Sequence, residues 1–174
     1  MREATIRGVR ESDIAAITRI YAEAVAHGTA SFELEPPDDA EMARRCRALI
    51  EGGFPYITAE LDGTVAGYAY AGPYRARRAY RWTVEDSIYI APQFHRRGIG
   101  ARLLARLIAD TERSGFRQMI AVIGDSLQVP SIAVHAAAGF TTIGTLRSVG
   151  FKHGKWLDTV LMQRALGTGD TAPP

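Results

Sequence analysis

A change of pattern partway along the chain is the sequence feature that most constrains its fold. Two runs with strand character, residues 56–61 and 64–70, are separated only by Asp62-Gly63. This pair suits a tight hairpin, because such turns need positive φ. From about residue 83 onward, strand-like and helix-like runs alternate instead. A hairpin followed by alternating elements predicts one mixed α/β sheet within a single domain.

The other elements are predicted from apolar spacing and from residues that start or stop helices. Apolar residues recur at helical spacing from Ile14 until Gly28, and Asp38 with Glu41 forms a capping pair for a second helix through Ile50. The remaining expected elements are strands at 4–9, 83–90 and 118–123, helices at 103–115 and 131–138, and final strands near Thr141 and Asp158. We expect the domain to cover residues 1–166, followed by a disordered tail at 167–174.

Composition places the chain among ordinary globular proteins. It has 174 residues, of which 47% are hydrophobic and 23% charged, and this length suffices for a core without metals or disulfides. No apolar run is long enough for a bilayer, and the N-terminus lacks a secretory pattern. The one cysteine, Cys46, is expected to be a buried thiol. These features predict a cytoplasmic protein without a membrane partner.

The charge distribution indicates local anion binding. The formal net charge is only +2. The arginines nevertheless gather in two clusters, Arg75, Arg77, Arg78 and Arg81, and then Arg96 with Arg97. Such clusters on a nearly neutral chain favour an anionic ligand over nucleic acid in general, and a solvated basic face is the alternative. The four histidines lack ligand spacing with cysteines or carboxylates, so no metal site is expected.

A glycine-containing turn follows the strand at 83–90. The run Arg96-Arg97-Gly98-Ile99-Gly100-Ala101 leads into a helix, and this layout can bind phosphate through free N–H groups at the helix start. Leu103 stands where a dinucleotide fingerprint needs its third glycine, and the chain has no Gly-Lys-Ser/Thr of a P-loop. Taken alone, the run is equally consistent with a plain turn.

The turn resembles that of the GCN5-related acetyltransferases, whose pattern is Arg/Gln-x-x-Gly-x-Gly/Ala, with His95 in the first place. The resemblance implies that acetyl-CoA is the co-substrate. Its pyrophosphate would lie on the turn residues Arg96, Arg97, Gly98, Ile99, Gly100 and Ala101. Its pantetheine arm would run along the backbone of the preceding strand, at Ile88, Tyr89 and Ile90.

Further segments, 71–85, 138–140, 145–156 and 29–32, resemble the phosphinothricin and methionine sulfoximine acetyltransferases of that family. This branch implies a single-domain acetyltransferase fold, with a mixed, mostly antiparallel sheet of about seven strands flanked by about four helices. It also implies a homodimer and a small amino-acid substrate that carries an anion near its amine. Polyamine or protein acetylation, and a non-catalytic CoA-binding module, are the alternatives.

Several residues are expected to bind that substrate. Arg75 and Arg77 are suitable partners, because a guanidinium group matches the two oxygens of an anion. Phe32 either walls the pocket or belongs to the plain core. Asp86 and Ser87, on the strand that follows the arginine cluster, are also expected at the substrate.

The resemblance places the general base at Glu85. Alternation along the strand puts Glu85, Ser87 and Tyr89 on one face, opposite Val84, Ile88 and Ile90. In the alternative interpretation Glu85 faces solvent or pairs with a nearby arginine, and Asp86 is a weaker competitor as base. The family's splayed strand further implies a free backbone N–H near Ile88, which would stabilise the thioester oxygen.

Two residues occupy family positions with different side chains. Many members carry an asparagine and, seven residues later, a tyrosine that protonates the leaving thiolate; here Gln128 and His135 stand at those places. Histidine can donate a proton near neutrality, so His135 is a candidate acid. The alternative is that it packs in the helix or lines the substrate site. Gln128 is expected to contact the cofactor in place of asparagine.

Overall fold

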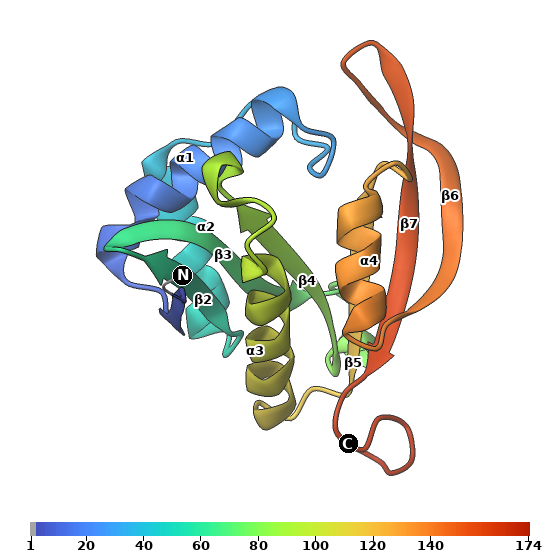
Figure 1. The fold of residues 1–174 in the computed structure, drawn as a ribbon. Helices are drawn as coiled ribbons and strands as arrows, with labels where there is room; N and C mark the ends of the chain where they lie inside the picture. The colour runs from blue at the N-terminus through green and yellow to red at the C-terminus, as the bar shows by residue number, and fades with distance from the viewer. Residues whose placement is uncertain (1–2) are drawn as a thin grey trace.

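The computed structural model describes residues 3–174, which form one seven-stranded sheet with helices on both faces (Figure 1). The strands are β1 (Thr5–Gly8), β2 (Tyr56–Leu61), β3 (Thr64–Pro73), β4 (Thr83–Ile90), β5 (Gln118–Gly124), β6 (Thr141–Lys152) and β7 (Lys155–Ala165). The helices are α1 (Ile14–His27), α2 (Asp39–Glu51), α3 (Ile99–Arg113) and α4 (Val129–Ala137), and three short 3-10 turns complete the elements.

The strand order is β1-β2-β3-β4-β5-β7-β6, and every neighbouring pair is antiparallel except β4 and β5, which are parallel. The predicted sheet, mixed but mostly antiparallel, is therefore confirmed. A parallel pair needs a crossover connection, and the chain provides one through the glycine-containing turn and α3. This crossover places the start of α3 next to the end of β4.

The local rules explain most element boundaries. Asp62 and Gly63 both have positive φ, 49° and 77°, as the tight hairpin between β2 and β3 requires. Gly28 ends α1, and the Asp38 side chain accepts a hydrogen bond from the Glu41 backbone N–H at the start of α2. In the expected capping box Glu41 would bond back to Asp38, but its carboxylate binds two arginines of the same helix instead.

One boundary was not expected. The strand expected at residues 64–70 does not end there, because β3 continues and pairs Gly72 with Glu85 and Pro73 with Val84. Proline is tolerated there because β2 pairs with β3 only as far as Tyr70, so Pro73 needs no ladder hydrogen bond on that side. The extension aligns β3 alongside the Glu85 end of β4.

The two faces of the sheet have different cores. Helix α3 packs Leu103, Leu104 and Leu107 on the face that also holds Val84 and Met119. Helices α1 and α2 cover the other face, where Tyr56 and Tyr68 stack with half-buried Tyr70 and Tyr89. The Cys46 thiol is buried in this second core, as expected, and burial raises its pKa to about 11.

The connection after α1 crosses the sheet toward β5 and the β6–β7 hairpin. We call residues 28–33 the strap. The Lys152 ammonium, buried in the hairpin, donates to the Ser31 carbonyl over 2.7 Å, and a Cβ added at Gly150 would lie 2.3 Å from the Phe32 ring. A Cβ at Gly124 would lie 2.6 Å from the Thr29 carbonyl oxygen. The strap is therefore in close contact with β5 and the hairpin.

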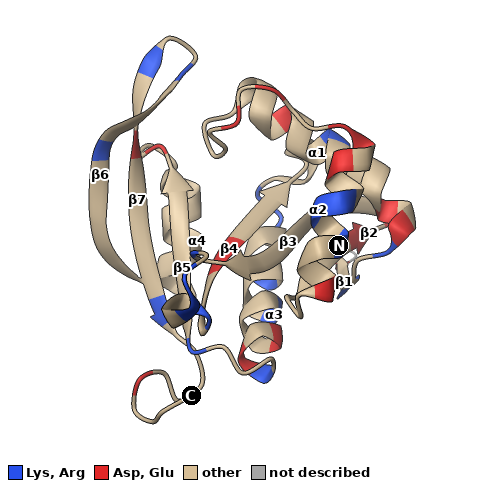
Figure 2. Ribbon diagram, turned by 180° about the vertical axis from the view of Figure 1, so that it is seen from behind, with Lys and Arg blue, Asp and Glu red and all other residues tan. Residues whose placement is uncertain are grey.

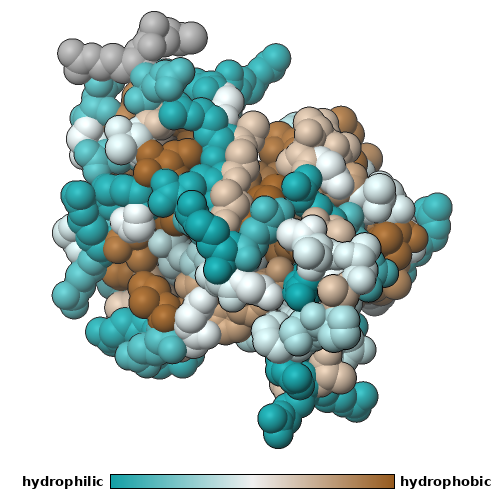
Figure 3. All heavy atoms as spheres, turned by 90° about the horizontal axis from the view of Figure 1, so that it is seen from below, coloured by the Kyte–Doolittle hydropathy of each residue, from teal (hydrophilic) through white to brown (hydrophobic). Residues whose placement is uncertain are grey.

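The outer surface is mixed in character. None of the helices that the structure describes is long and apolar enough to cross a membrane. The face shown in Figure 3 is largely hydrophilic, with apolar side chains in separate patches. After Leu166, which is buried, residues 167–174 form turns in which the Gly169 N–H donates to the Leu166 carbonyl. The disorder expected for this segment stays a prediction.

Candidate active site

The centre of the candidate site is the point where β4 and β5 part. Their pairing runs from Thr83 with Gln118 to Asp86 with Ala121 and then stops, although β4 continues to Ile90 and β5 to Gly124. Within residues 3–174 the last part of β4 therefore has a strand partner only in β3. Backbone N–H and C=O groups that lack a strand partner need other hydrogen-bond partners. The predicted splayed strand is present, and it exposes the backbone at 87–90.

The glycine turn lies where this opening meets α3. Arg96 and Gly98 both have positive φ, 60° and 74°, and such alternation turns successive N–H groups toward one side. The His95 ring lies 2.9 Å from the Ile90 carbonyl oxygen and attaches the turn to the end of β4. The Arg97 guanidinium lies over the Phe94 ring. The predicted turn is thus joined directly to the parted strand.

Gly100 gives a test of whether this turn suits a diphosphate. A Cβ built at Gly100 meets nothing closer than 4.0 Å, so packing within the protein does not require glycine there. Gly98, by contrast, is explained by its positive φ. A side chain at Gly100 would occupy open space at the N-terminus of a 15-residue helix. The arrangement fits a ligand that approaches the backbone closely and carries negative charge.

A small cavity lies between the parted strands and under the strap. Its walls come from β4, β5, α4 and Ala30, and the residues of the prediction that line it are Asp86, Ser87, Ile88, Tyr89, Gln128 and His135. The Gln128 amide donates to the Thr29 hydroxyl over 3.1 Å, so it ties the strap to the cavity wall. Whether Gln128 also contacts a cofactor stays a prediction.

Glu85 lies on the face of β4 that also carries Tyr89, opposite Tyr68 of β3, as alternation predicted. We call this side of the sheet the tyrosine face. The cross-strand partner of Glu85 is Gly72, and Glu85 is half-buried. Burial raises the pKa of Glu85 to about 7; the nearby Asp86 charge also raises it, and Arg75 opposes the shift. A carboxyl group with that pKa can exchange protons near neutrality. The solvent-facing alternative for Glu85 does not fit this burial.

Asp86 points to the opposite face and pairs with His135. His135 Nε2 lies 2.9 Å from Asp86 Oδ2, and both side chains are buried. His135 Nδ1 lies 2.7 Å from the Ser131 carbonyl oxygen, which can only accept, so Nδ1 carries a proton. Burial lowers the pKa of His135, but the Asp86 carboxylate outweighs it and the net shift is upward. Asp86 Oδ1 is buried and has no hydrogen-bond partner among residues 3–174.

The predicted substrate residues lie around the tyrosine face and the strap. The Arg75 guanidinium is exposed over the Tyr74 ring, 5.1 Å from its centroid, and close enough to Glu85 to affect its pKa. Arg77 is exposed before the short 3-10 turn Arg78–Tyr80. Phe32 is half-exposed, with its ring against the backbone of Gly124 and Gly150. The structure brings Arg75, Glu85 and Ser87 to one side of β3 and β4; their roles toward a substrate stay predictions.

Charges are spread over the molecule, with basic and acidic residues mixed on the helices and loops (Figure 2). No group of three His, Cys, Asp or Glu side chains that could hold a metal ion is present in the part of the chain that the structure describes.

Sequence reasoning missed the contribution of Tyr70. It pairs with Ser87 across β3 and β4, and its hydroxyl interacts with the Ser87 side chain. The spacing of Tyr68 and Tyr70 does place both on one strand face, and their cross-strand partners Tyr89 and Ser87 lie on the same face of the sheet. Without the register between β3 and β4, however, nothing links that face to Glu85.

Comparison with known proteins agrees with this geometry. Residues 6–161 match the model of the acetyltransferase (GNAT) domain. The phosphinothricin N-acetyltransferase of Alcaligenes faecalis is 55% identical, over 98% of this chain and 86% of that protein. The L-methionine sulfoximine/L-methionine sulfone acetyltransferase of Salmonella typhimurium is 40% identical, over 93% of this chain and 94% of that protein.

Solved structures give the same result. A GNAT superfamily phosphinothricin acetyltransferase from Sinorhizobium meliloti, determined in complex with AcCoA, has a TM-score of 0.97 and 48% identity, over 99% of this chain and 94% of that chain. The structure of yncA from Salmonella typhimurium with its cofactor acetyl-CoA has a TM-score of 0.95 and 37% identity, over 99% of this chain and 98% of that chain. The resemblance and the fold predicted from the sequence are confirmed.

The raised pKa of Glu85 predicts that stability depends on pH. Between the ordinary carboxyl value and about 7, the unfolded chain releases this proton while the folded chain keeps it, so the free energy of unfolding falls as pH rises through that window. Glu85→Gln removes this titration and is expected to lose less stability than the wild type between about pH 5 and about pH 8. Urea unfolding at both pH values measures the difference, and equal losses would show that the pKa is not raised.

Proposed function

Since the chain belongs to the GNAT family of acetyltransferases, we propose that it transfers the acetyl group of acetyl-CoA to the amine of a small anionic amino acid or analogue. The class intended is that of phosphinothricin and of methionine sulfoximine or sulfone, the compounds named for its relatives. The single observation that carries the proposal is Glu85, a carboxyl group with a pKa of about 7 on β4, the strand that parts from β5.

Acetyl-CoA is the proposed co-substrate. Its pyrophosphate would bind the turn at 96–101, where positive φ and the start of α3 favour an anion. Its pantetheine arm would use the backbone of Ile88, Tyr89 and Ile90, which pairs only with β3 within the described residues. The two Salmonella and Sinorhizobium structures that hold acetyl-CoA support this assignment through their likeness to the whole chain.

The proposed reaction is direct transfer. Glu85 accepts a proton from the ammonium group of the acceptor, either directly or through a water molecule, and a pKa near the working pH is optimal for that task. The free amine then attacks the thioester carbon, and the bond between carbon and sulfur breaks. A backbone N–H near Ile88 would stabilise the oxygen that gathers negative charge. No covalent enzyme intermediate is needed.

His135 is the proposed proton donor for the leaving thiolate. Its raised pKa favours the protonated ring near neutrality. The Nδ1 proton is held by the Ser131 carbonyl, so the proton available for transfer lies between Nε2 and Asp86. Asp86 keeps the ring oriented toward the cavity that both residues line.

Recognition of the acceptor falls to the residues around Glu85. Arg75 and Arg77 are the proposed partners of its carboxylate, since a guanidinium group can bind both oxygens. Ser87 lines the cavity beside Glu85, and Phe32 closes the strap side against Gly124 and Gly150. The positive charges of Arg75 and Arg77 disfavour a polyamine acceptor, because a polycation would need an acidic groove.

The first prediction tests the reaction itself. Purified protein with acetyl-CoA and a panel of amino acids, including phosphinothricin and methionine sulfone, should release CoA only when a suitable amine is present. Glu85→Gln should lower the rate by about 10²–10⁴-fold, because a general base contributes that much, with the affinity for acetyl-CoA little changed. CoA release that no amine stimulates would contradict the proposal, and turnover of polyamines or protein N-termini alone would support the alternative acceptors.

The second prediction concerns Arg75. Arg75→Ala should raise the KM for the amino acid about tenfold or more, since a charge-assisted hydrogen bond is lost, while the KM for acetyl-CoA stays the same. Arg78→Ala is the matched control, because Arg78 belongs to the same cluster but begins the short turn Arg78–Tyr80. An equal rise in both KM values, or an equal effect in Arg78→Ala, would argue against carboxylate binding by Arg75.

A homodimer is also part of the proposal. Strand β6 lies at the edge of the sheet, and its hairpin with β7 exposes large apolar side chains, namely Ile143, Leu146, Val149, Phe151 and Trp156. Exposed apolar groups of this kind are typical of protein interfaces.

The supply of acetyl-CoA inside cells and the free, buried Cys46 are consistent with the cytoplasm as the proposed compartment.

The third prediction tests the apolar surface of the β6–β7 hairpin as the dimer contact. Sedimentation should give the mass of a dimer for the wild type, and Phe151→Ser should shift the equilibrium toward monomer at least tenfold, because apolar area is removed from the contact. Leu34→Ser is the control, since Leu34 is 71% exposed but lies on the connection after α1. A wild-type monomer throughout the concentration range would rule out the dimer.

A further inference from the structure

The strap contributes Ala30 to the cavity between the parted strands, and side chains hold the residues on both sides of it. The Thr29 hydroxyl donates to the Asp125 carboxylate, just after β5, over 2.9 Å. The Ser31 and Tyr21 hydroxyls lie 2.9 Å apart, and Tyr21 belongs to α1. The position of Ala30 at the cavity is therefore fixed by contacts with two other parts of the chain.

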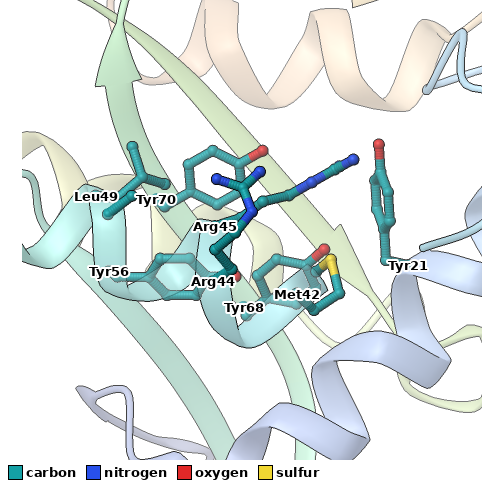
Figure 4. A pocket seen from close by; sticks show the side chains of 9 residues that line it. Tyr21, Met42, Arg44, Arg45, Leu49, Tyr56, Tyr68 and Tyr70 are labelled. Carbon is teal, nitrogen blue, oxygen red and sulfur yellow. The ribbon is translucent and has the colours of Figure 1, made fainter. Parts of the chain in front are cut away.

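Tyr21 connects the strap to the packed core on the α1 side. It lines a larger cavity, of about 300 Å³, between α1, α2 and the sheet, where it projects from α1 with its hydroxyl pointing away from that helix (Figure 4). Its ring packs edge-on against Tyr89, 5.0 Å between centroids, and Tyr89 lines the cavity between the parted strands. The hydrogen bond between Tyr21 and Ser31 thus attaches the strap to well-packed aromatic side chains.

Lys152 holds the strap from the side of the β6–β7 hairpin. Of the twelve residues of β6 it is the only buried one, and its ammonium donates to the Ser31 carbonyl oxygen over 2.7 Å. Burying an ammonium group costs free energy, and a methionine of similar length would fill the space without that cost. The contact with Ser31 therefore accounts for a lysine at this position.

Two glycines on different strands make room for the strap. Gly124 of β5 and Gly150 of β6 do not have positive φ, so backbone conformation does not require glycine at either position. A Cβ at Gly150 would lie 2.3 Å from the Phe32 ring, and one at Gly124 would lie 2.6 Å from the Thr29 carbonyl oxygen and 2.9 Å from the same ring. Carbon atoms in contact lie about 3.5–4.0 Å apart. The strap is therefore what requires glycine at both positions.

The Phe32 ring has one supported side and one open side. It is 37% exposed, although part of it lies against Gly124 and Gly150. A ring that two strands support from one side has few orientations left, so its open side can form a fixed wall for a bound side chain. Because the strap carries both Phe32 and Ala30, a displacement of the strap would move this wall and the cavity lining together.

We propose that Lys152 and Gly150 are positioning residues for the acceptor, because they hold the strap against the β6–β7 hairpin with Phe32 and Ala30 in place. This inference rests on the proposed acetyl transfer to a small amino acid. Neither Lys152 nor Gly150 contacts the substrate or the cofactor, and both act through the strap. Their replacement should therefore raise the KM for the acceptor and leave kcat and the KM for acetyl-CoA largely unchanged.

The first test is a double-mutant cycle between Gly150 and Phe32. Gly150→Ala should raise the KM for the preferred acceptor of the amino-acid panel about tenfold, because the added methyl group displaces the ring. In a Phe32→Ala background the same change should raise this KM less than about twofold, since the ring is absent. Gly144→Ala is the matched control, because it lies on the same strand and a Cβ there meets nothing within 4 Å. An equal fold rise in both backgrounds would contradict the proposal.

Lys152→Met keeps the inference testable if Gly150→Ala disturbs folding. It removes the donor to the Ser31 carbonyl, so it should raise the KM for the same acceptor about tenfold. It should also speed amide hydrogen exchange in the strap while exchange in α3 stays the same. Arg147→Met is the control, since it removes a cation from an exposed position of β6. Unchanged exchange in the strap, or faster exchange with an unchanged KM, would contradict the positioning role.

The outcomes separate this inference from the proposed function. A wild type that acetylates none of the amino acids would contradict the proposed function, and with it any role toward the acceptor. Equal KM values for the acceptor in an active wild type, Gly150→Ala and Lys152→Met would contradict the positioning role alone.

Discussion

Backbone hydrogen bonding between β4 and β5 stops after Asp86 and Ala121, while both strands continue. The rest of the site depends on this parting. It opens the cavity under the strap, leaves the backbone at 87–90 without a second strand partner among the described residues, and directs β4 into the turn at the start of α3. A closed parallel sheet would bury these groups and leave no place for an extended ligand.

The alternation of β4 divides the chemistry between two faces. Glu85 points to the tyrosine face, where burial brings its pKa to about 7, and Asp86 points to the opposite face, where it orients His135. The two adjacent carboxyl groups thus have different surroundings, and the charge of Asp86 raises the pKa of Glu85. In the proposed reaction one group accepts the proton of the amine and the other holds the ring that protonates the thiolate.

Much of this could be predicted from local patterns, because local chemistry sets those features. Asp62-Gly63, the Asp38 cap, Gly28 and the face of Glu85 all follow from φ preferences, capping or alternation, and the structure contains each of them. The continuation of β3 through Pro73 was not predictable, because it depends on where β2 stops pairing.

Contacts between distant segments also could not be predicted from the sequence. Lys152 with Ser31, Gln128 with Thr29, and Asp86 with His135 join residues that lie 121, 99 and 49 positions apart. No spacing rule connects such pairs, so the strap and the buried pair appear only with the topology. The cavity that Tyr21, Met42 and Tyr68 line between α1, α2 and the sheet belongs to the same group, because it requires both the sheet register and the placement of α2.

The proposed reaction depends most on Glu85 as the group that accepts the proton of the amine. The most direct measurement is the pH dependence of kcat/KM for the acceptor, in the wild type and in Glu85→Gln. The wild-type kcat/KM should fall below a pH of about 7, where Glu85 becomes protonated, and this limb should be absent from the residual activity of the variant. The same limb, with the same midpoint, in both enzymes would contradict it.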